Sequence, residues 1–353
     1  MARGRCPFDA TRARPREKEA EPDMIVDVHT HYLPTSHRPM VETLTAMSGP
    51  PTAPAANSTS VARRMFAAMS DAPGMIDQRI DMMDDAGVER QILSPGSLAP
   101  YATESRLAVE AAHMLNDSYC ELTSSRPSRF SAFVSLPLPH IDASLEEMRR
   151  GLDELGMVGV AVSCSVFNRS TAEAEFEPLY EEMNARGTAL FFHPCQNGIC
   201  SPLINDYGFT AAAGASLEDT AIVLHLIKRN IPVRYPNIKI IIPHLGGLIP
   251  MQLARLDGQA HTPDLLSPPS AMARSLYYDT VGWGSQAALR CACEAFGADH
   301  LVPGSDFSAL LAVESYSRTF EYIKESRLSD EDIEKILHCN ASALFDFDKA
   351  PCR

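Results

Sequence analysis

Basic residues are scarce in this sequence relative to acidic ones. Lysine and arginine together number 31 against 45 aspartates and glutamates, which gives the 353-residue chain a formal net charge of −14. A surface of this sign repels phosphate backbones and anionic lipid, so the composition argues against nucleic-acid binding and against a membrane-surface role. If the ligand is itself an anion, its site must supply local positive charge from a metal ion or from arginine.

Long apolar runs are also missing, and no stretch approaches the length of a membrane span. Residues 1–23 are charged and have no apolar central segment, so we interpret them as a flexible extension and not as a secretory signal. Hydrophobic residues make up 45% of the chain, the usual level for a globular protein. We expect a single domain over residues 24–353, located in the cytoplasm.

The nine cysteines are scattered, and no two of them have zinc-ribbon spacing. Cys291 and Cys293 are separated by one residue within a helix-like stretch, which is too close for the usual CxxC geometry. We therefore predict free thiols in a reducing compartment.

Short apolar stretches alternate with helix-like stretches along most of the chain. The strand-like stretches are residues 24–28, 90–94, 130–137, 158–163, 188–194, 238–244, 275–281 and 300–306. A helix is predicted to end at Gly87, and another begins where Ser329 and Asp332 resemble a capping box. Residues 48–60, rich in proline, alanine and serine, are predicted to form a loop that could cover a site.

This repeating βα pattern predicts a parallel sheet, and eight such units favour a (β/α)8 TIM barrel. A doubly wound open sheet is the structural alternative. Its dinucleotide-binding version is disfavoured, because no Gly-x-Gly-x-x-Gly follows a strand.

Polar residues recur at the predicted strand ends, where a barrel places its active site. These residues are His29, His31, His193, His244, Asp279 and Asp306. Strand alternation puts His29 and His31 on one face, so both imidazoles can point to one metal ion. A single histidine at a strand end is more often structural, but so many at separate strand ends are hard to ascribe to chance. Three imidazoles and one carboxylate suit Zn, Mn or Fe and leave a position open for water or substrate.

Several segments carry a resemblance to a known family: DVHTH, RIDMMDDAGV, FFHP, PHLGG, ARLD, PGSDF and NASALF. With them the sequence resembles the amidohydrolase superfamily. The particular branch is that of aminocarboxymuconate-semialdehyde decarboxylase and related nonoxidative aromatic acid decarboxylases, such as 6-methylsalicylate decarboxylase. The resemblance runs from about Met24 to Phe347.

The resemblance implies that one divalent metal ion is held by His29, His31, His193 and Asp306, with Zn expected and Mn as the alternative. It implies that His244 is the catalytic acid/base, and Asp306 is a further candidate proton donor. The fourth predicted strand lacks the lysine that becomes carboxylated in binuclear amidohydrolases, which favours a single metal ion.

The resemblance also implies substrate-binding residues. Arg79 matches a position that holds a substrate carboxylate, as a guanidinium does well by bidentate hydrogen bonding. Arg255 matches a position where an arginine completes the site of a neighbouring subunit, so we expect a homodimer. Asp279 is expected to orient His244 or the substrate.

The sequence departs from the branch at three places. Ser308 stands after Phe307, where the family often has proline, and Cys195 stands where aminocarboxymuconate members carry tryptophan. Residues 196–210 also differ, and we expect them to line the substrate pocket. These departures favour a salicylate-type acid over aminocarboxymuconate.

The predicted function is metal-dependent, nonoxidative decarboxylation of a small aromatic or unsaturated carboxylic acid. The alternative is metal-dependent hydrolysis of a lactone, an amide or a C–C bond, for which the metal would activate water and His244 would act as base. A noncatalytic binding protein on the same barrel is a third hypothesis, but it would be expected to have lost the metal ligands.

Overall fold

The computed structural model describes residues 25–40, 43–44, 67–259, 263–345 and 347. The predicted extension (residues 1–23) and the predicted loop (residues 48–60) lie outside these described residues.

Within the described part of the chain, eight parallel strands follow one another around a barrel in the order of the sequence. They are β1 (Ile25–His31), β2 (Val88–Ser94), β3 (Phe130–Ser135), β4 (Gly159–Ser163), β7 (Ala189–His193), β8 (Lys239–Ile242), β9 (Tyr277–Asp279) and β10 (Leu301–Val302). Each agrees with one of the predicted strand-like stretches to within a few residues.

Backbone hydrogen bonds between β1 and the segment after β10 close the ring. The amide of Val28 donates to the carbonyl of Pro303 at 2.9 Å, and the amide of Asp306 donates to the carbonyl of His29 at 2.9 Å. Closure confirms the predicted (β/α)8 barrel over the open-sheet alternative, in which the two edge strands would stay unpaired.

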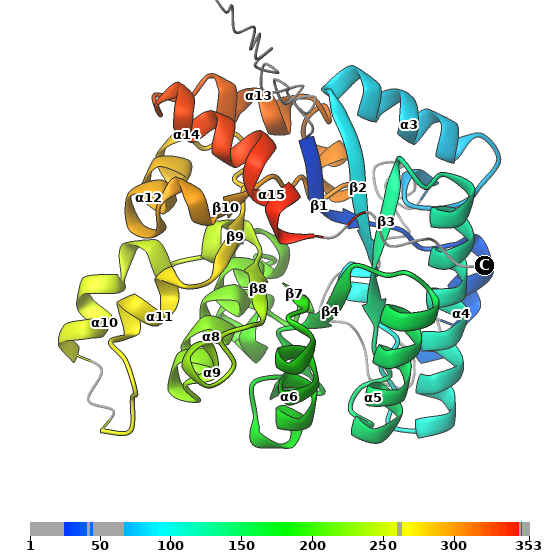
Figure 1. Ribbon diagram of the computed structural model, residues 1–353, viewed down its shortest axis with the longest axis horizontal. Helices are drawn as coiled ribbons and strands as arrows, with labels where there is room; N and C mark the ends of the chain where they lie inside the picture. The colour runs from blue at the N-terminus through cyan, green and yellow to red at the C-terminus, as the bar shows by residue number, and fades with distance from the viewer. Residues whose placement is uncertain (1–24, 41–42, 45–66, 260–262, 346, 348–353) are drawn as a thin grey trace, which may run out of the picture.

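Helices surround the strands on the outside of the barrel (Figure 1). The main ones are α3 (Met75–Ala86), α4 (Ser105–Ser125), α5 (Ile141–Arg149), α6 (Glu177–Arg186), α8 (Ala215–Lys228), α10 (Leu253–Gln259), α11 (Pro269–Arg274), α12 (Gln286–Phe296), α13 (Arg318–Lys324), α14 (Asp330–Glu334) and α15 (Asn340–Leu344).

Two predicted helix boundaries are confirmed. Gly87 ends α3 with a left-handed φ of 71°, which costs glycine little. The Ser329 hydroxyl accepts a hydrogen bond from the amide of Asp332 at 3.1 Å at the start of α14.

The hydrophobic core has two layers. An outer layer lies between the strands and the helices. An inner layer fills the barrel, and in it the ring of Phe191 stacks on Phe133 at 5.4 Å and meets the His29 ring edge-on at 5.0 Å. The site at the strand ends therefore rests on an apolar floor.

Short elements form the rim at the carboxyl ends of the central strands. A hairpin of β5 (Ser165–Val166) and β6 (Arg169–Ser170) follows β4. The 3₁₀ turn Gly198–Cys200 and the short helix α7 (Pro202–Asn205) follow β7.

The cysteine prediction is confirmed for most of the described thiols. Six cysteines are free in the described part of the chain: Cys164, Cys195, Cys200, Cys291, Cys293 and Cys339. Cys120 is bonded in a disulfide, so the prediction of free thiols is wrong for that residue. Among the described helices, none combines the length and the apolar character needed to cross a membrane.

Candidate metal centre

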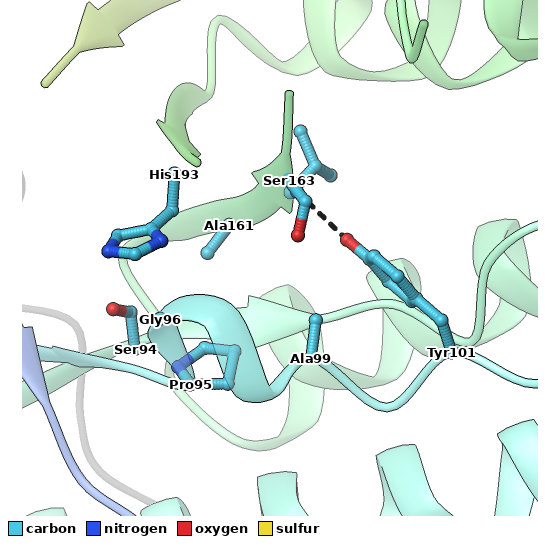
Figure 2. A pocket seen from close by; sticks show the side chains of 9 residues that line it. Ser94, Pro95, Gly96, Ala99, Tyr101, Ala161, Ser163 and His193 are labelled. Atoms are coloured by element: carbon cyan, nitrogen blue, oxygen red, sulfur yellow. Dashed lines mark hydrogen bonds between the residues drawn. The ribbon is translucent and has the colours of Figure 1, made fainter. Parts of the chain in front are cut away.

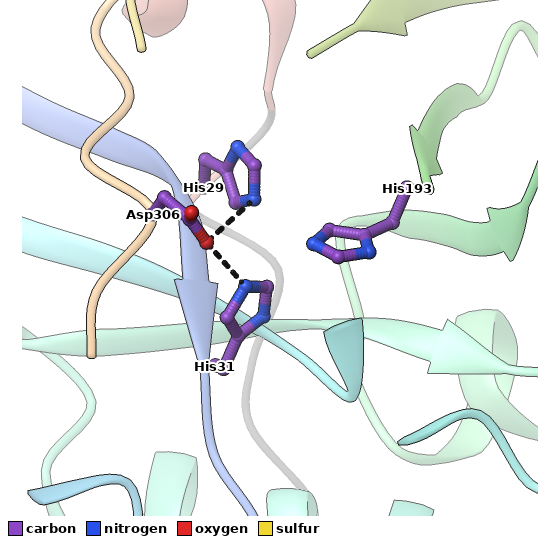
Figure 3. A group of neighbouring side chains, drawn as sticks. All are labelled: His29, His31, His193 and Asp306. Carbon is purple, nitrogen blue, oxygen red and sulfur yellow. Dashed lines mark hydrogen bonds and ion pairs between the residues drawn. The ribbon is translucent and has the colours of Figure 1, made fainter. Parts of the chain in front are cut away.

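The structure brings together four of the residues predicted at strand ends. His29 and His31 come from β1, His193 from the end of β7, and Asp306 from the loop after β10. One possible ligand atom from each lies within 4.8 Å of the corresponding atom of every other. Figure 3 shows His193 facing the group formed by Asp306 and the two β1 histidines across a common centre.

A local irregularity in β1 accompanies this convergence. The pairing register of β1 with β2 shifts between Asp27 and Thr30, on either side of His29. The rings of His29 and His31 nevertheless both face the centre, with their centroids 5.1 Å apart, and His31 lies 4.7 Å from His193. The i, i+2 spacing thus puts both imidazoles inside the barrel, as expected.

Each of the three histidines uses its Nδ1 atom for a hydrogen bond within the protein. His29 Nδ1 lies 2.6 Å from Asp279 Oδ2, and His193 Nδ1 lies 2.7 Å from the carbonyl of Pro194. His31 Nδ1 lies 3.2 Å from the Ser94 hydroxyl, which donates its own proton to the carbonyl of Thr30. These acceptors place the imidazole proton on Nδ1, so the Nε2 lone pair of each ring is left for a metal ion.

The charge state of the group also suits a metal ion. Burial lowers the pKa of His31 and holds the pKa of His193 well below its usual range, so both imidazoles are neutral, as ligands must be. Burial tends to raise the pKa of Asp306, but the neighbouring imidazoles of His244 and His31 outweigh this effect and hold it well below its usual range. Asp306 is therefore an anionic oxygen ligand.

One buried atom points directly to a missing partner. His29 Nε2 is buried and has no hydrogen-bond partner among the described residues, and it lies 3.4 Å from Asp306 Oδ1. Leaving such an atom unpaired is costly unless something else binds it. Three Nε2 atoms and one carboxylate fit a divalent ion of the first transition row, with room for a further ligand.

Backbone geometry keeps this group tight. Asp306 has a left-handed φ of 60°, a strained conformation that is found mainly at functional sites. Gly96, with φ +60°, approaches so closely that a Cβ there would lie 2.7 Å from the ring of His31. A Cβ on Gly304 would lie 2.8 Å from Asp279 and 3.1 Å from His29.

His244 lies beside the group and has its own carboxylate partner. Its ring is 5.4 Å from His29, and its Nε2 atom lies 3.9 Å from Asp306 Oδ2. Its Nδ1 atom lies 2.9 Å from Oδ2 of Asp219, a fully buried residue on α8. Burial alone would lower the pKa of His244, but Asp219, followed by Asp306 and Asp279, raises it well above its usual range. The imidazole is thus prepared to carry a proton next to the site.

Asp219 is a functional candidate that the sequence reasoning missed. It lies within a helix instead of at a strand end, and only its occurrence beside Glu218 just before the apolar run of that helix could have drawn attention to it. Burial raises its pKa to about 6, while His244 opposes the shift. Its neighbour Glu218 accepts hydrogen bonds from the amides of Cys195 and Gly198 and so orders the start of the loop after β7.

Asp279 contacts His29 as well as His244, the residue that it was expected to orient. One of its oxygens binds His29 Nδ1, and the other accepts hydrogen bonds from the amides of His244 at 2.8 Å and Val281 at 3.0 Å. Both oxygens are therefore engaged by the protein. Asp279 orients His29 and the backbone of His244, and the side chain is fully buried.

Arg79 is hydrogen-bonded to groups of the protein. We expected it to hold a substrate carboxylate, but its side chain is fully buried behind β1. It donates to the carbonyl of His31 at 2.8 Å and to Gln91 Oε1 at 2.5 Å, and it lies over the ring of Phe307. Arg79 thus supports the strand that carries two of the candidate ligands, and it does not line the cavity described below.

Arg255 lies on α10 and is exposed, with its Nε atom 3.2 Å from Gln259 Oε1. The structure does not bring it to the four-residue group of its own chain. Its expected role in a neighbouring subunit stays a prediction.

A small cavity opens beside His193, and about 180 Å³ of empty space lies in and in front of it, part of which is open solvent. The walls come from the ends of β2 and β4: Ser94, Pro95, Gly96, Ala99, Tyr101, Ala161, Val162 and Ser163. Figure 2 shows the Tyr101 ring reaching toward Ser163, whose amide donates to the Tyr101 hydroxyl at 2.9 Å. Residues 196–210, which we expected to line the substrate pocket, do not contribute to this cavity.

Fold and site together define a (β/α)8 barrel with a His–His–His–Asp group at the carboxyl ends of its strands. The sequence matches the amidohydrolase family over residues 26–347. The chain therefore belongs to the amidohydrolase family.

Three relatives show where in that family the similarity lies. The chain is 26% identical to 2-amino-3-carboxymuconate-6-semialdehyde decarboxylase of Dictyostelium discoideum, over 77% of each chain. It is 29% identical to gamma-resorcylate decarboxylase of Rhodococcus jostii, over 77% of this chain and 88% of the relative. It is 24% identical to 2-keto-4-carboxy-3-hexenedioate hydratase of a Sphingobium species, over 91% of this chain and 96% of the relative. The resemblance to the decarboxylase branch is confirmed.

A solved structure shares the fold. Dihydroxybenzoic acid decarboxylase of Polaromonas sp. JS666, crystallised with manganese and the inhibitor 2-nitroresorcinol, superimposes with a TM-score of 0.77 at 22% identity. The alignment covers 93% of this chain and 98% of that one.

Proposed function

We propose that this protein is a metal-dependent, nonoxidative decarboxylase of a small aromatic or unsaturated carboxylic acid. The observation that carries the proposal is the convergence of three Nε2 lone pairs and the Asp306 carboxylate beside a protonatable His244. The decarboxylases among the relatives support the reaction type. A salicylate-type acid is the substrate class we favour, because the relatives include gamma-resorcylate decarboxylase and 6-methylsalicylic acid decarboxylase.

The difficult step in such a reaction is the negative charge left on carbon when CO₂ departs. A divalent ion held by His29, His31, His193 and Asp306 would supply a Lewis acid that orients the substrate and stabilises this charge. His244 would deliver the proton to the carbon atom that loses CO₂, and Asp219 would keep it protonated and oriented. Asp306, 3.9 Å from His244 Nε2, would share in proton handling.

We infer that the site binds a single metal ion, and we propose manganese as that metal. The sequence suggested zinc, but the donor set accepts either metal, and the Polaromonas relative was crystallised with manganese. A homodimer completed by Arg255 and a cytoplasmic location both stay predictions.

The decisive experiment loads metal-free protein with Mn²⁺ or Zn²⁺ and supplies salicylate, 6-methylsalicylate and 2,6-dihydroxybenzoate. We expect CO₂ release with at least one acid, dependent on the metal. His244→Ala should keep its metal but lose about 10²–10⁴-fold in kcat. Full turnover by that variant would remove His244 from the mechanism.

Addition of water or hydrolysis is the second candidate function. The hydratase relative, aligned over nearly its whole length, favours keeping this possibility, since the same site could activate water with His244 as base. Consumption of an unsaturated keto acid, a lactone or an amide without CO₂ release would decide for it. Protein that binds no metal even after reconstitution would instead support the noncatalytic hypothesis.

A further inference from the structure

A continuous line of hydrogen bonds runs through the buried side chains behind the metal centre. It consists of Arg79 on α3, Gln91 on β2, Tyr316 before α13, Asp27 on β1 and Ser305 before Asp306, and we call these five residues the relay. None of the five is more than 3% exposed. Burying so many polar groups is costly unless they have partners, and among the side-chain N and O atoms of the relay Arg79 Nη2 is the one without a hydrogen-bond partner in the described part of the chain.

In the stretch of the relay from Arg79 to Asp27, the hydrogen bonds all point in one direction. Arg79 Nε donates to Gln91 Oε1 at 2.5 Å, and Gln91 Nε2 donates to the Tyr316 hydroxyl at 2.7 Å. The Tyr316 hydroxyl in turn donates to Asp27 Oδ2 at 2.6 Å. A guanidinium thus stands at one end and a carboxylate at the other, an arrangement in which each hydrogen bond polarises and strengthens the next.

Both ends of the relay grip the backbone that carries candidate ligands. At one end, Arg79 Nη1 donates to the carbonyl of His31 at 2.8 Å. At the other end, Asp27 Oδ1 accepts the amide of His29 at 3.2 Å. Asp27 also binds Ser305 twice, through the amide at 3.0 Å and through the hydroxyl at 2.5 Å.

Ser305 directly precedes Asp306, so the relay ties together two of the three separate parts of the chain that supply candidate ligands. Phe307 completes the link on the other side of Asp306, because its ring lies between Arg79 (4.5 Å) and Tyr316 (5.3 Å). Asp306 is therefore flanked on both sides by residues that the relay holds.

We propose that the relay is a positioning network that sets the distance between the β1 ligands and Asp306 and so tunes the affinity of the site for its metal ion. The inference rests on the proposed function only in assuming that the four-residue group binds a divalent ion. None of the relay side chains would touch the metal or the substrate. They act through the backbone of His29, His31 and Asp306.

The test compares two buried tyrosine hydroxyls. Tyr316→Phe removes the central link of the relay while keeping the ring. Tyr278→Phe is the matched control, because the hydroxyl of that fully buried residue donates to the carbonyl of Ala273 at 2.7 Å and has no part in the relay. Metal-free protein is titrated with Mn²⁺, free Mn²⁺ is counted by electron paramagnetic resonance, and the melting temperature of each metal-free variant is measured alongside.

We expect Tyr316→Phe to weaken Mn²⁺ binding about 10- to 100-fold, the usual effect of losing a residue that supports metal ligands. Tyr278→Phe should bind Mn²⁺ like the unaltered protein. If the relay only stabilises the fold, both variants will bind Mn²⁺ equally tightly and differ only in melting temperature, and the inference is overturned. Unaltered protein that binds neither Mn²⁺ nor Zn²⁺ would instead overturn the proposed function.

A second variant covers the case in which Tyr316→Phe does not fold. Gln91→Met, close in size to glutamine, breaks the relay between Arg79 and Tyr316 and should weaken Mn²⁺ binding in the same way. In the double variant the two losses should not multiply, because either change alone disconnects Arg79 from Asp27. Losses that multiply would show that the two residues act independently, against the relay.

Discussion

The imidazole of His244 and the buried carboxylate of Asp219 form an ion pair, with Nδ1 and Oδ2 2.9 Å apart. Asp219 lies on α8, which precedes β8 in the chain, and His244 follows that strand with a left-handed φ of 50°. The other ring nitrogen of His244, Nε2, lies 3.9 Å from Asp306 Oδ2. The pair therefore holds a group that can carry a proton beside the candidate metal ligands.

Asp219→Asn should move the alkaline limb of the rate profile to lower pH. Asp219 raises the pKa of His244 well above its usual range, so its loss lowers that pKa and leaves less of the imidazole protonated at neutral pH. If His244 donates the proton, kcat/KM then begins to fall at a lower pH. Glu218→Gln, a neighbouring buried acid that binds loop amides, is the control and should leave the limb in place. An unmoved limb in Asp219→Asn would argue against His244 as the donor.

Asp279→Asn should weaken metal binding about 10- to 100-fold, because His29 Nδ1 loses the anionic acceptor that holds its ring and proton in place. Isothermal titration of metal-free protein with Mn²⁺ gives the affinity. Asp257→Asn is a suitable control, since the carboxylate of Asp257 accepts the amide of Ser270 and takes no part in the site. Equal affinities in the two variants would contradict the proposed role of Asp279.

Gly96→Ala should displace His31 and reduce both metal content and stability. Its Cβ would lie 2.7 Å from the imidazole, and its φ of +60° disfavours any residue with a side chain. Gly258→Ala, where a Cβ meets open space on α10, is the contrasting change and should be neutral or stabilise the protein by up to about 1 kcal/mol. Metal analysis after dialysis, together with thermal unfolding, distinguishes the two. Unchanged metal content in Gly96→Ala would contradict the expected displacement.

Removal of the metal should lower the melting temperature in a way that depends on metal concentration. Three buried imidazoles and a carboxylate converge on one centre, so an ion that binds there stabilises the folded state by about 2.7 kcal/mol at a hundredfold excess over Kd. Thermal unfolding with increasing Mn²⁺, and again after chelation, measures the effect. A melting temperature that does not respond to Mn²⁺ or Zn²⁺ would argue against a metal site.

Much of the fold and the composition of the candidate centre followed from the sequence. The strands are short apolar stretches, and parallel strands in a barrel must present their ends at one rim. Residues such as His29, His193 and Asp306 could therefore be grouped before any distances were known. The i, i+2 spacing of His29 and His31 was informative for the same reason, since it depends only on the geometry of a strand.

The supporting residues could not be found in this way. Asp219 and Arg79 lie on helices, and which side of a helix faces the site depends on how the helix packs on the barrel. The resemblance implied that Arg79 binds a substrate carboxylate, whereas the packing of α3 buries its side chain against the backbone of His31. The sequence by itself determined which residues stand at the strand ends. Only the tertiary structure decided what holds them, because those contacts join segments that are far apart along the chain.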